Sequence, residues 1–159
     1  MAMYATARAG WTPIAHADSA SSLADASYHA WRTTTASTLK VQDVIVGGEA
    51  TSSTVNRMSV RRISTNISTP TNKTPAPLHP WSAASAANHV SAATTGPTIA
   101  STVHLLDLAL NTFGGIIRWV AHPGEELWAL NSTAPNGEIV LDSISGTGLV
   151  STNMIFEEI

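Results

Sequence analysis

Apolar and polar residues alternate along most of residues 39–159, with the period of two that β-strands produce. The alternation predicts short strands over residues 39–46, 55–67, 116–122, 124–130, 138–145 and 149–159. Residues 103–111 have mixed periodicity that also fits a short helix, and we predict a strand there because Gly114-Gly115 follows closely. Glycine-rich or Asn-Gly turns separate several of these segments, at Gly47-Gly48, Gly114-Gly115, Asn136-Gly137 and Gly146-Thr147-Gly148. Short strands at roughly ten-residue spacing are typical of an antiparallel β-sandwich, so the sequence predicts an all-β fold.

The same alternation assigns side chains to faces. Within residues 39–46, the odd-numbered positions are predicted to share one face, namely Leu39, Val41, Asp43 and Ile45. Trp119 and Trp128 fall inside predicted strands, and we expect both of them in the core. In the second strand, Arg61 and Arg62 are predicted to point to opposite faces, with one exposed and one at an interface.

Residues 1–38 have a different pattern, because Ala, Ser and Thr dominate and the aromatic residues are widely spaced. Such a segment buries little apolar area of its own, so we predict an irregular N-terminal arm that either adds an edge strand or orders against a neighbour. A short helix over residues 18–29, with Asp18 as its N-cap, is a weaker prediction. The predicted domain organisation is therefore an arm over residues 1–38 and a sandwich over residues 39–159.

Residues 68–98 contain four prolines between positions 70 and 80, followed by another Ala/Ser/Thr-rich stretch. Proline cannot donate to a sheet and favours extended loops. The sequence therefore predicts a long central loop here. Because it exceeds the usual loop length of about 12–15 residues, we expect a functional or partner-ordered segment.

Composition and charge exclude several classes of protein. The chain of 159 residues has 12% charged residues, a net charge of −3 and no cysteine. The lack of cysteine excludes disulfides and thiolate metal sites, and the negative charge argues against nucleic-acid binding, which requires cations to neutralise phosphates. We also expect neither a secretory signal nor a membrane helix, because no apolar run has the required length and flanks.

The charges are unevenly distributed along the chain. Residues 1–106 carry seven basic and four acidic groups, whereas residues 107–159 carry one basic and seven acidic groups. The imbalance is either an ordinary fluctuation or the sign of a contact between unlike surfaces of neighbouring molecules.

Motifs for catalysis or metal binding are weak throughout the sequence. The six histidines form no HExxH or alternating pair, and surface or capping roles are expected for them. Glu125 and Glu126 are adjacent in a predicted strand, so their carboxylates point to opposite faces and cannot act as an acid/base pair. Glu157 and Glu158 fail for the same reason. We therefore expect no enzyme activity, no cofactor and no metal.

Tryptophan is unusually frequent, with five Trp beside only two Phe and two Tyr. Three of the five lie in the Ala/Ser/Thr-rich stretches, where little local core exists. Such a residue either packs onto the sandwich or anchors a partner, because Trp is enriched at interface hot spots. The candidate partner-interface residues are accordingly Tyr4, Arg8, Trp11, Trp31 and Trp81.

The C-terminal part resembles a family of small structural proteins encoded among the head genes of tailed bacteriophages. In these proteins a W-x-x-x-P-G-E-E segment precedes a glycine-turned final hairpin that ends in F-E-E or W-E-E. The corresponding residues here are Trp119, Pro123, Gly124, Glu125 and Glu126, followed by Phe156, Glu157 and Glu158. Upstream, LKVQDVIVGGEATSS and VNRMSVRRIS are similar to the family's strand, turn and Arg-bearing second strand, so the resemblance covers about residues 39–67 and 116–159.

The resemblance implies a capsid decoration (cement) protein with a jelly-roll fold. Such a protein binds the exterior of the assembled head and stabilises the shell across subunit joints. Its implied partners are the major capsid protein and further copies of itself in a homotrimer, with no nucleic acid and no membrane. It is made in the host cytoplasm and ends on the capsid surface of the virion. The alternative is a tail, fibre or receptor-binding module that binds carbohydrate through exposed Trp, and a cupin-like metalloprotein is a distant third.

Overall fold

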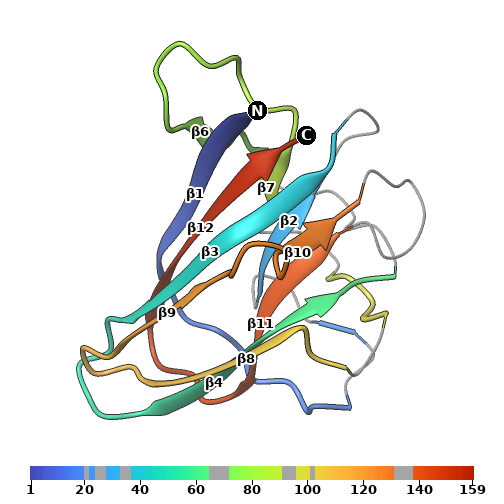
Figure 1. Cartoon of the computed structure of the whole chain (residues 1–159). Helices are drawn as coiled ribbons and strands as arrows, with labels where there is room; N and C mark the ends of the chain where they lie inside the picture. The colour runs from blue at the N-terminus through green and yellow to red at the C-terminus, as the bar shows by residue number, and fades with distance from the viewer. Residues whose placement is uncertain are drawn as a thin grey trace.

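The computed structural model describes residues 1–19, 22–23, 28–32, 37–64, 72–90, 96–100, 103–130 and 138–159. In this part of the chain, strands joined by turns form two antiparallel sheets, and no helix occurs (Figure 1). The two sheets pack face to face around a shared core. The predicted all-β antiparallel sandwich is therefore confirmed.

Sheet 1 is built around the last strand, β12 (Val150–Glu158). Along nearly its whole length β12 pairs with β1 (Ala2–Trp11) on one side and with β3 (Leu39–Gly48) on the other. Three short strands complete the sheet: β6 (Ala76–Pro77) beside β1, and both β9 (Ile116–Val120) and β10 (Leu127–Ala129) beside β3.

Sheet 2 is built around β11 (Ile139–Ser145), which lies between β2 (Tyr28–Arg32) and β4 (Val55–Arg62). Beyond β4 the edge strand is β8 (Leu106–Asn111). Beyond β2 the sheet continues through two short strands, β7 (Asn88–Val90) and β5 (Asn72–Lys73).

The core lies between the sheets and consists of side chains that point inward from both. Val44 of β3 and Phe156 of β12 project from sheet 1, and Met58 of β4 and Leu141 of β11 project from sheet 2. Burying one such side chain contributes roughly 1.5–3 kcal/mol. Because a slip of one residue would turn these side chains to solvent, the burial also fixes the strand register.

A β-bulge in β3 changes the faces predicted for this strand. Phe156 of β12 pairs with Val41, while the residue before Phe156 pairs with Asp43, so the register skips Gln42. An inserted residue of this kind reverses the alternation on its far side. The prediction of one shared face for Leu39, Val41, Asp43 and Ile45 is therefore wrong beyond the bulge, and the inward residues are Leu39, Val41, Val44 and Val46.

The predicted irregular N-terminal arm is wrong for the two strands that residues 1–38 contain. β1 lies inside sheet 1 between β12 and β6, and β2 lies inside sheet 2 between β11 and β7. In β1, Tyr4 and Thr6 point inward and Ala5 and Ala7 point outward. Because the outward residues are alanines and one inward residue is a threonine, the two faces differ little in hydrophobicity, and the sequence gives only a weak strand pattern. Both sheets thus combine strands from residues 1–38 with strands from residues 39–159.

Two further predictions need correction. The helix over residues 18–29 is wrong where the chain is described, since Ser22 forms a bridge with Thr98 and Tyr28 begins β2. The central loop over residues 68–98 is not strand-free, because it contains β5, β6 and β7. The remaining parts of these segments, and the Asn136-Gly137 turn, lie in ranges outside the described residues: 20–21, 24–27, 65–71, 91–95 and 131–137.

The chain covers the outer face of sheet 2 with its own segments. Leu23 and Ile99 pack there against Tyr28 in a second apolar cluster. Beside this cluster, Arg61 of β4 and Asp142 of β11 form an ion pair whose side chains are both 0% exposed. Arg61 was predicted to be either exposed or at an interface, but its Nη1 instead donates a hydrogen bond to the Asp18 carbonyl oxygen at 3.2 Å.

The uneven charge distribution is largely balanced within the molecule. Five ion pairs among the described residues join a Lys or Arg before position 107 to an acidic residue at or after it: Arg32–Glu138, Lys40–Glu126, Lys40–Glu157, Arg57–Asp107 and Arg61–Asp142. The fold therefore brings the basic and acidic parts of the chain together, and the imbalance along the sequence does not require a second molecule.

Among the described residues, no helix is long and apolar enough to cross a membrane.

Candidate partner-binding surfaces

Three turns meet at one end of the sandwich, where backbone hydrogen bonds tie them together. Gly48 N donates to the Gly115 oxygen at 2.7 Å, and Glu49 N donates to the Leu149 oxygen at 2.9 Å. These bonds join the turns that follow β3, follow β8 and precede β12, at the lower end of Figure 1. We call this region the glycine-tied end, and it comprises residues 48–55, 111–116 and 146–150.

The glycine-tied end depends on close approach of one backbone to another. Asn56 is buried beneath it and bonds Gly148 twice, since its Nδ2 donates to the Gly148 oxygen at 2.9 Å and its Oδ1 accepts from Gly148 N at 3.1 Å. A Cβ on Gly148 would lie 2.1 Å from Thr112 Oγ1, and one on Gly48 would lie 2.4 Å from the Thr112 backbone. Only glycine fits at these positions without displacing a neighbour. The sequence indicates the turns but not their mutual contact.

This fixed end displays large apolar side chains. Val55 and Phe113 are each 62% exposed, and Ile116 is 77% exposed. Phe113 is held in place because its backbone N donates to Asn111 Oδ1 at 2.9 Å, and Asn111 pairs with Val55 across the strands. A rigid loop loses little conformational entropy when it binds, so the arrangement favours a protein contact.

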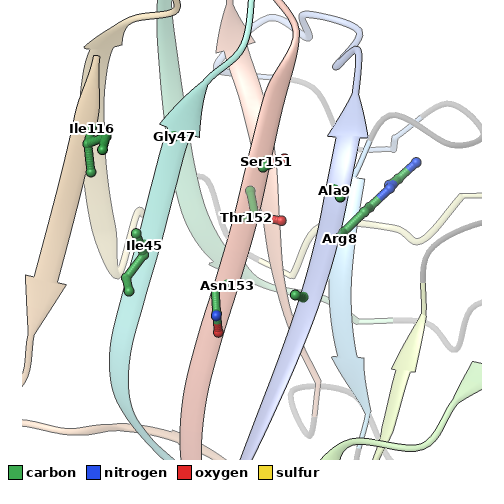
Figure 2. Close-up of a pocket in the computed structure, with 9 residues that line it drawn as sticks. Arg8, Ala9, Ile45, Gly47, Ile116, Ser151, Thr152 and Asn153 are labelled. Atoms are coloured by element: carbon green, nitrogen blue, oxygen red, sulfur yellow. The ribbon is translucent and has the colours of Figure 1, made fainter. Parts of the chain in front are cut away.

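A shallow depression of about 270 Å³ lies beside the glycine-tied end, on the outer face of sheet 1. Figure 2 shows its walls: Ile45 and Gly47 of β3 and Ile116 of β9 on one side, and Ala9 of β1 on the other. Ser151, Thr152 and Asn153 of β12 form its floor, and Ala7 and Arg8 of β1 also line it. Small and apolar side chains predominate, so the depression can accept an apolar group but holds few groups that could act chemically.

A second protruding element occurs between β6 and β7, over residues 78–87, and we call it the Trp81 loop. Trp81 is 86% exposed at its tip. The base of the loop is fastened to β12, because the Glu158 carboxylate accepts from Ser85 Oγ at 2.7 Å and from Ala86 N at 3.1 Å. On the β1 side, Tyr4 Oη donates to the Ala83 oxygen at 3.0 Å. The indole is therefore presented on an ordered support.

The two protruding elements lie at opposite ends of the same strand. The glycine-tied end contacts the start of β12 through Leu149, and the Trp81 loop contacts its finish through Glu158. At about 3.3 Å per residue, these points are roughly 30 Å apart. In Figure 1 the Trp81 loop accordingly projects at the upper end, near both termini. The described residues thus display exposed apolar side chains at two separate ends of the sandwich.

The five residues predicted to contact a partner do not form one surface. Tyr4, Trp11 and Trp31 are buried inside the chain and belong to the core. Their prediction as surface anchors is wrong, because β1 and β2 are interior strands that carry these rings between the sheets. Only Trp81 is exposed as an anchor would be. Arg8 is among the residues that line the depression, and its guanidinium lies 4.4 Å from the centre of the Trp11 ring.

Arg8 is placed at the edge of the interior rather than in solvent. Its Nη1 donates to the Tyr28 carbonyl oxygen. Burial lowers the pKa of the Arg8 guanidinium to about 10, so the group remains charged at neutral pH. Arg8 therefore joins β1 of sheet 1 to β2 of sheet 2.

Of the two tryptophans predicted to lie in the core, one packs against it and the other does not. Trp119 packs against the core from β9, as predicted. Trp128 instead points outward from β10, where Lys40 Nζ lies 5.7 Å from the centre of its ring. The prediction for Trp128 is wrong because the register pairs it with Lys40, an outward residue of β3.

Two histidines, predicted to lie at the surface or in caps, are buried together between the sheets. The rings of His29 on β2 and His89 on β7 are 4.0 Å apart, and Nε2 of each has no hydrogen-bond partner among the described residues. Desolvation lowers the pKa of His89 to about 4 and that of His29 well below its usual value, and the nearby cations Lys73 and Arg8 act in the same direction. Both rings are therefore neutral at pH 7.

The histidine pair predicts loss of stability in acid. A histidine whose pKa is lower in the folded state binds more protons when unfolded, so the free energy of unfolding falls between pH 6.5 and about 4. For His89 alone the loss approaches about 3 kcal/mol. Glu138 acts oppositely, since burial raises its pKa to about 7 and protonation favours the folded state.

Comparison of the wild type with His89→Gln isolates the histidine contribution, because Glu138 is common to both. We expect urea unfolding from pH 7.5 to 4.5 to show a shallower loss of stability for the variant. Equal slopes for the two proteins would contradict the assignment of acid sensitivity to His89.

Among the described residues, no group of three or more His, Asp or Glu is placed to hold a metal ion. Comparison of the chain with protein-family models, with curated proteins and with solved structures gives no match.

Proposed function

We propose that this chain is a structural virion protein of the cement type, which binds the exterior of an assembled phage head and stabilises it across subunit joints. The observation that carries the proposal is the pair of fixed apolar surfaces at opposite ends of one sandwich. A protein that joins two subunits needs two such surfaces on a rigid body. The proposed partners are the major capsid protein and further copies of this chain in a homotrimer.

The strand order supports the jelly-roll part of the proposal. Eight main strand positions follow one another along the chain, and they alternate between the two sheets except at β4 and β8, which are neighbours in sheet 2. Sheet 1 contains β1, β3, the β9/β10 position and β12. The intervening strands β2, β4, β8 and β11 form the main part of sheet 2. Double-sheet folds of this kind occur in viral capsid and lectin domains.

Such a protein stabilises a shell through its binding equilibrium alone, without catalysis. A chain that binds assembled shells but not free coat subunits shifts the assembly equilibrium by an amount set by its affinity and concentration. Three linked copies increase the occupancy of each site through effective concentration. The rigid supports of Phe113 and Trp81 reduce the entropy lost in each contact.

Trp81→Ala tests the contact at the loop end. Because Trp81 is 86% exposed, its removal leaves the melting temperature unchanged. A lost hot spot of about 2 kcal/mol weakens binding to heads by about 30-fold. Co-sedimentation of purified protein with heads stripped of it measures the change, and Val103→Ala, at another exposed apolar position, is the control. Unchanged binding by Trp81→Ala would remove this loop from the shell contact.

A carbohydrate-binding tail or fibre module is the second candidate, and the exposed indole of Trp81 favours it, because aromatic faces pack against sugars. A glycan array distinguishes the two functions. A signal that is lost with Trp81→Ala supports the receptor-binding function, whereas binding to heads without any glycan signal supports the cement function.

A further inference from the structure

Polar side chains join the β2 and β7 part of sheet 2 to sheet 1. His29 Nδ1 lies 2.5 Å from Thr152 Oγ1 of β12, and Trp31 Nε1 donates to Thr6 Oγ1 of β1 at 2.8 Å. The His89 ring on β7 packs against the His29 ring, with 4.0 Å between their centres. Both imidazoles are buried, and Nε2 of each has no hydrogen-bond partner among the described residues. The space between the sheets therefore encloses two titratable groups that have little access to water.

The charged groups that act on this histidine pair are both cations. Lys73 lies opposite His89 in the pairing of β5 with β7, and Arg8 reaches from β1 to the Tyr28 carbonyl oxygen on β2. The carboxylates on or beside the neighbouring strands are engaged by other groups: Glu138 by Arg32, Asp142 by Arg61, Glu157 by Lys40, and Glu158 by Ser85. A protonated imidazole in the closed structure is therefore repelled by two cations and has no carboxylate partner among the described residues.

The strand that carries His89 is the most weakly attached part of this region. β7 is three residues long, and it pairs with β2 through three residues and with β5 through two. Short ladders at the edge of a sheet open at a lower free energy than the whole domain. Separation of β7 from β12 would hydrate the His89 ring and expose the His29 ring that it covers. Protonation can therefore be accommodated by local opening, without unfolding of the sandwich.

β7 directly continues the Trp81 loop. Ala87, one residue before β7, is buried in the core, and its backbone N donates to Ser85 Oγ at 3.1 Å. Ser85 Oγ in turn donates to the Glu158 carboxylate that fastens the loop to β12. Movement of β7 out of the sandwich would displace these two residues, and the loop would lose its support.

We propose that protonation of His29 and His89 opens β7 from the sandwich and releases the base of the Trp81 loop, so that acid weakens the contact made by Trp81. The opening is a property of the chain alone. Its effect on attachment to a shell rests on the proposed function.

The direction and size of the effect follow from proton linkage. Burial and the two cations lower the pKa of His89 from its ordinary value of 6.5 to about 4 in the closed structure. The open form therefore binds more protons than the closed form as the pH falls below 6.5. Between pH 7.5 and 4.5, the ratio of open to closed β7 is expected to rise roughly 70-fold from His89 alone.

The test is hydrogen exchange of the purified full chain at pH 7.5 and 4.5, with rates corrected for the intrinsic effect of pH on amide exchange. We expect protection of residues 78–90 to fall roughly 70-fold in acid, while the centre of β12 stays protected. His89→Gln should abolish most of this fall. His79→Gln, an exposed histidine in the Trp81 loop itself, is the matched control and should behave as the wild type.

Lys73→Met provides a second variant that keeps both histidines, and Lys73 is exposed. Loss of this cation should raise the pKa of His89 and make the fall in protection smaller. Unchanged protection of residues 78–90 in acid, an equal loss in β12, or a full loss in His89→Gln would each overturn the proposal.

Co-sedimentation with heads at the two pH values then tests the link to the shell. We expect acid to release the wild type and to release His89→Gln much less. Heads that retain the wild type at pH 4.5, although β7 opens, would refute the proposed shell contact of Trp81 and not the opening itself. Failure of this proposal is therefore distinguishable from failure of the cement function.

Discussion

Asp142→Ala is expected to lower the free energy of unfolding by about 3–5 kcal/mol, because it leaves Arg61 buried without its counter-charge. The Arg61 and Asp142 side chains are both 0% exposed, and Asp142 Oδ1 also accepts from Ser59 Oγ at 2.8 Å. Arg61 in turn holds the segment at Asp18 against sheet 2. The substitution should therefore loosen the cover of this sheet as well as destabilise the whole fold. Urea unfolding gives the free energy, and hydrogen exchange near β4 and β11 reports the local opening.

Two further variants show whether the loss of stability comes from leaving a charge buried or simply from removing an ion pair. Arg57→Ala removes a similar Arg–Asp pair on the same strand, but Arg57 and Asp107 are exposed, so stability should hardly change. The double variant Arg61→Met/Asp142→Leu removes both charges and fills the space, and it should recover most of the loss. A single Asp142→Ala variant as stable as the wild type would contradict the buried ion pair.

Gly48→Ala is expected to destabilise the fold by about 3 kcal/mol, toward the upper end of what overpacking usually costs. The added Cβ would meet the Thr112 backbone at 2.4 Å, and backbone atoms cannot move aside as a flexible side chain does. The turns after β3 and β8 would have to separate, which displaces Phe113 at the glycine-tied end. Shell binding should fall together with stability.

Gly47→Ala is the control at the adjacent position, because a Cβ there meets nothing within 4 Å. Replacement of a strand glycine by alanine reduces the entropy of the unfolded chain, so this variant should gain roughly 0.5–1 kcal/mol. Thermal unfolding of the two variants measures the contrast. Equal melting temperatures would show that the turns are not packed as closely as described.

Much of the fold could be predicted from residues 39–159, where apolar and polar residues alternate strongly and glycines mark the turns. The prediction failed where this contrast is weak. β1 alternates Tyr4 and Thr6 with alanines, so a central strand resembled an irregular arm. In β3 a single bulge at Gln42 reversed the faces, and no local signal in the sequence marks it.

The candidate partner-binding surfaces were harder to predict from the sequence than the fold. Trp81 was recognised as a candidate because its neighbours offer no local core, but the same argument selected Trp11 and Trp31, which long-range strand pairing buries. The glycine-tied end joins residues about 100 positions apart in the chain, as in the Glu49–Leu149 hydrogen bond. Such a contact follows from topology rather than from any local pattern.

The proposed role as a cement protein is tested most directly by an electron-microscopy reconstruction of the virions that carry this chain. The account predicts density for the sandwich on the outer surface of the head, at joints between capsid subunits. Its two ends, at Trp81 and at Phe113, should face different coat subunits. Heads without this density, or density confined to the tail, would contradict the account.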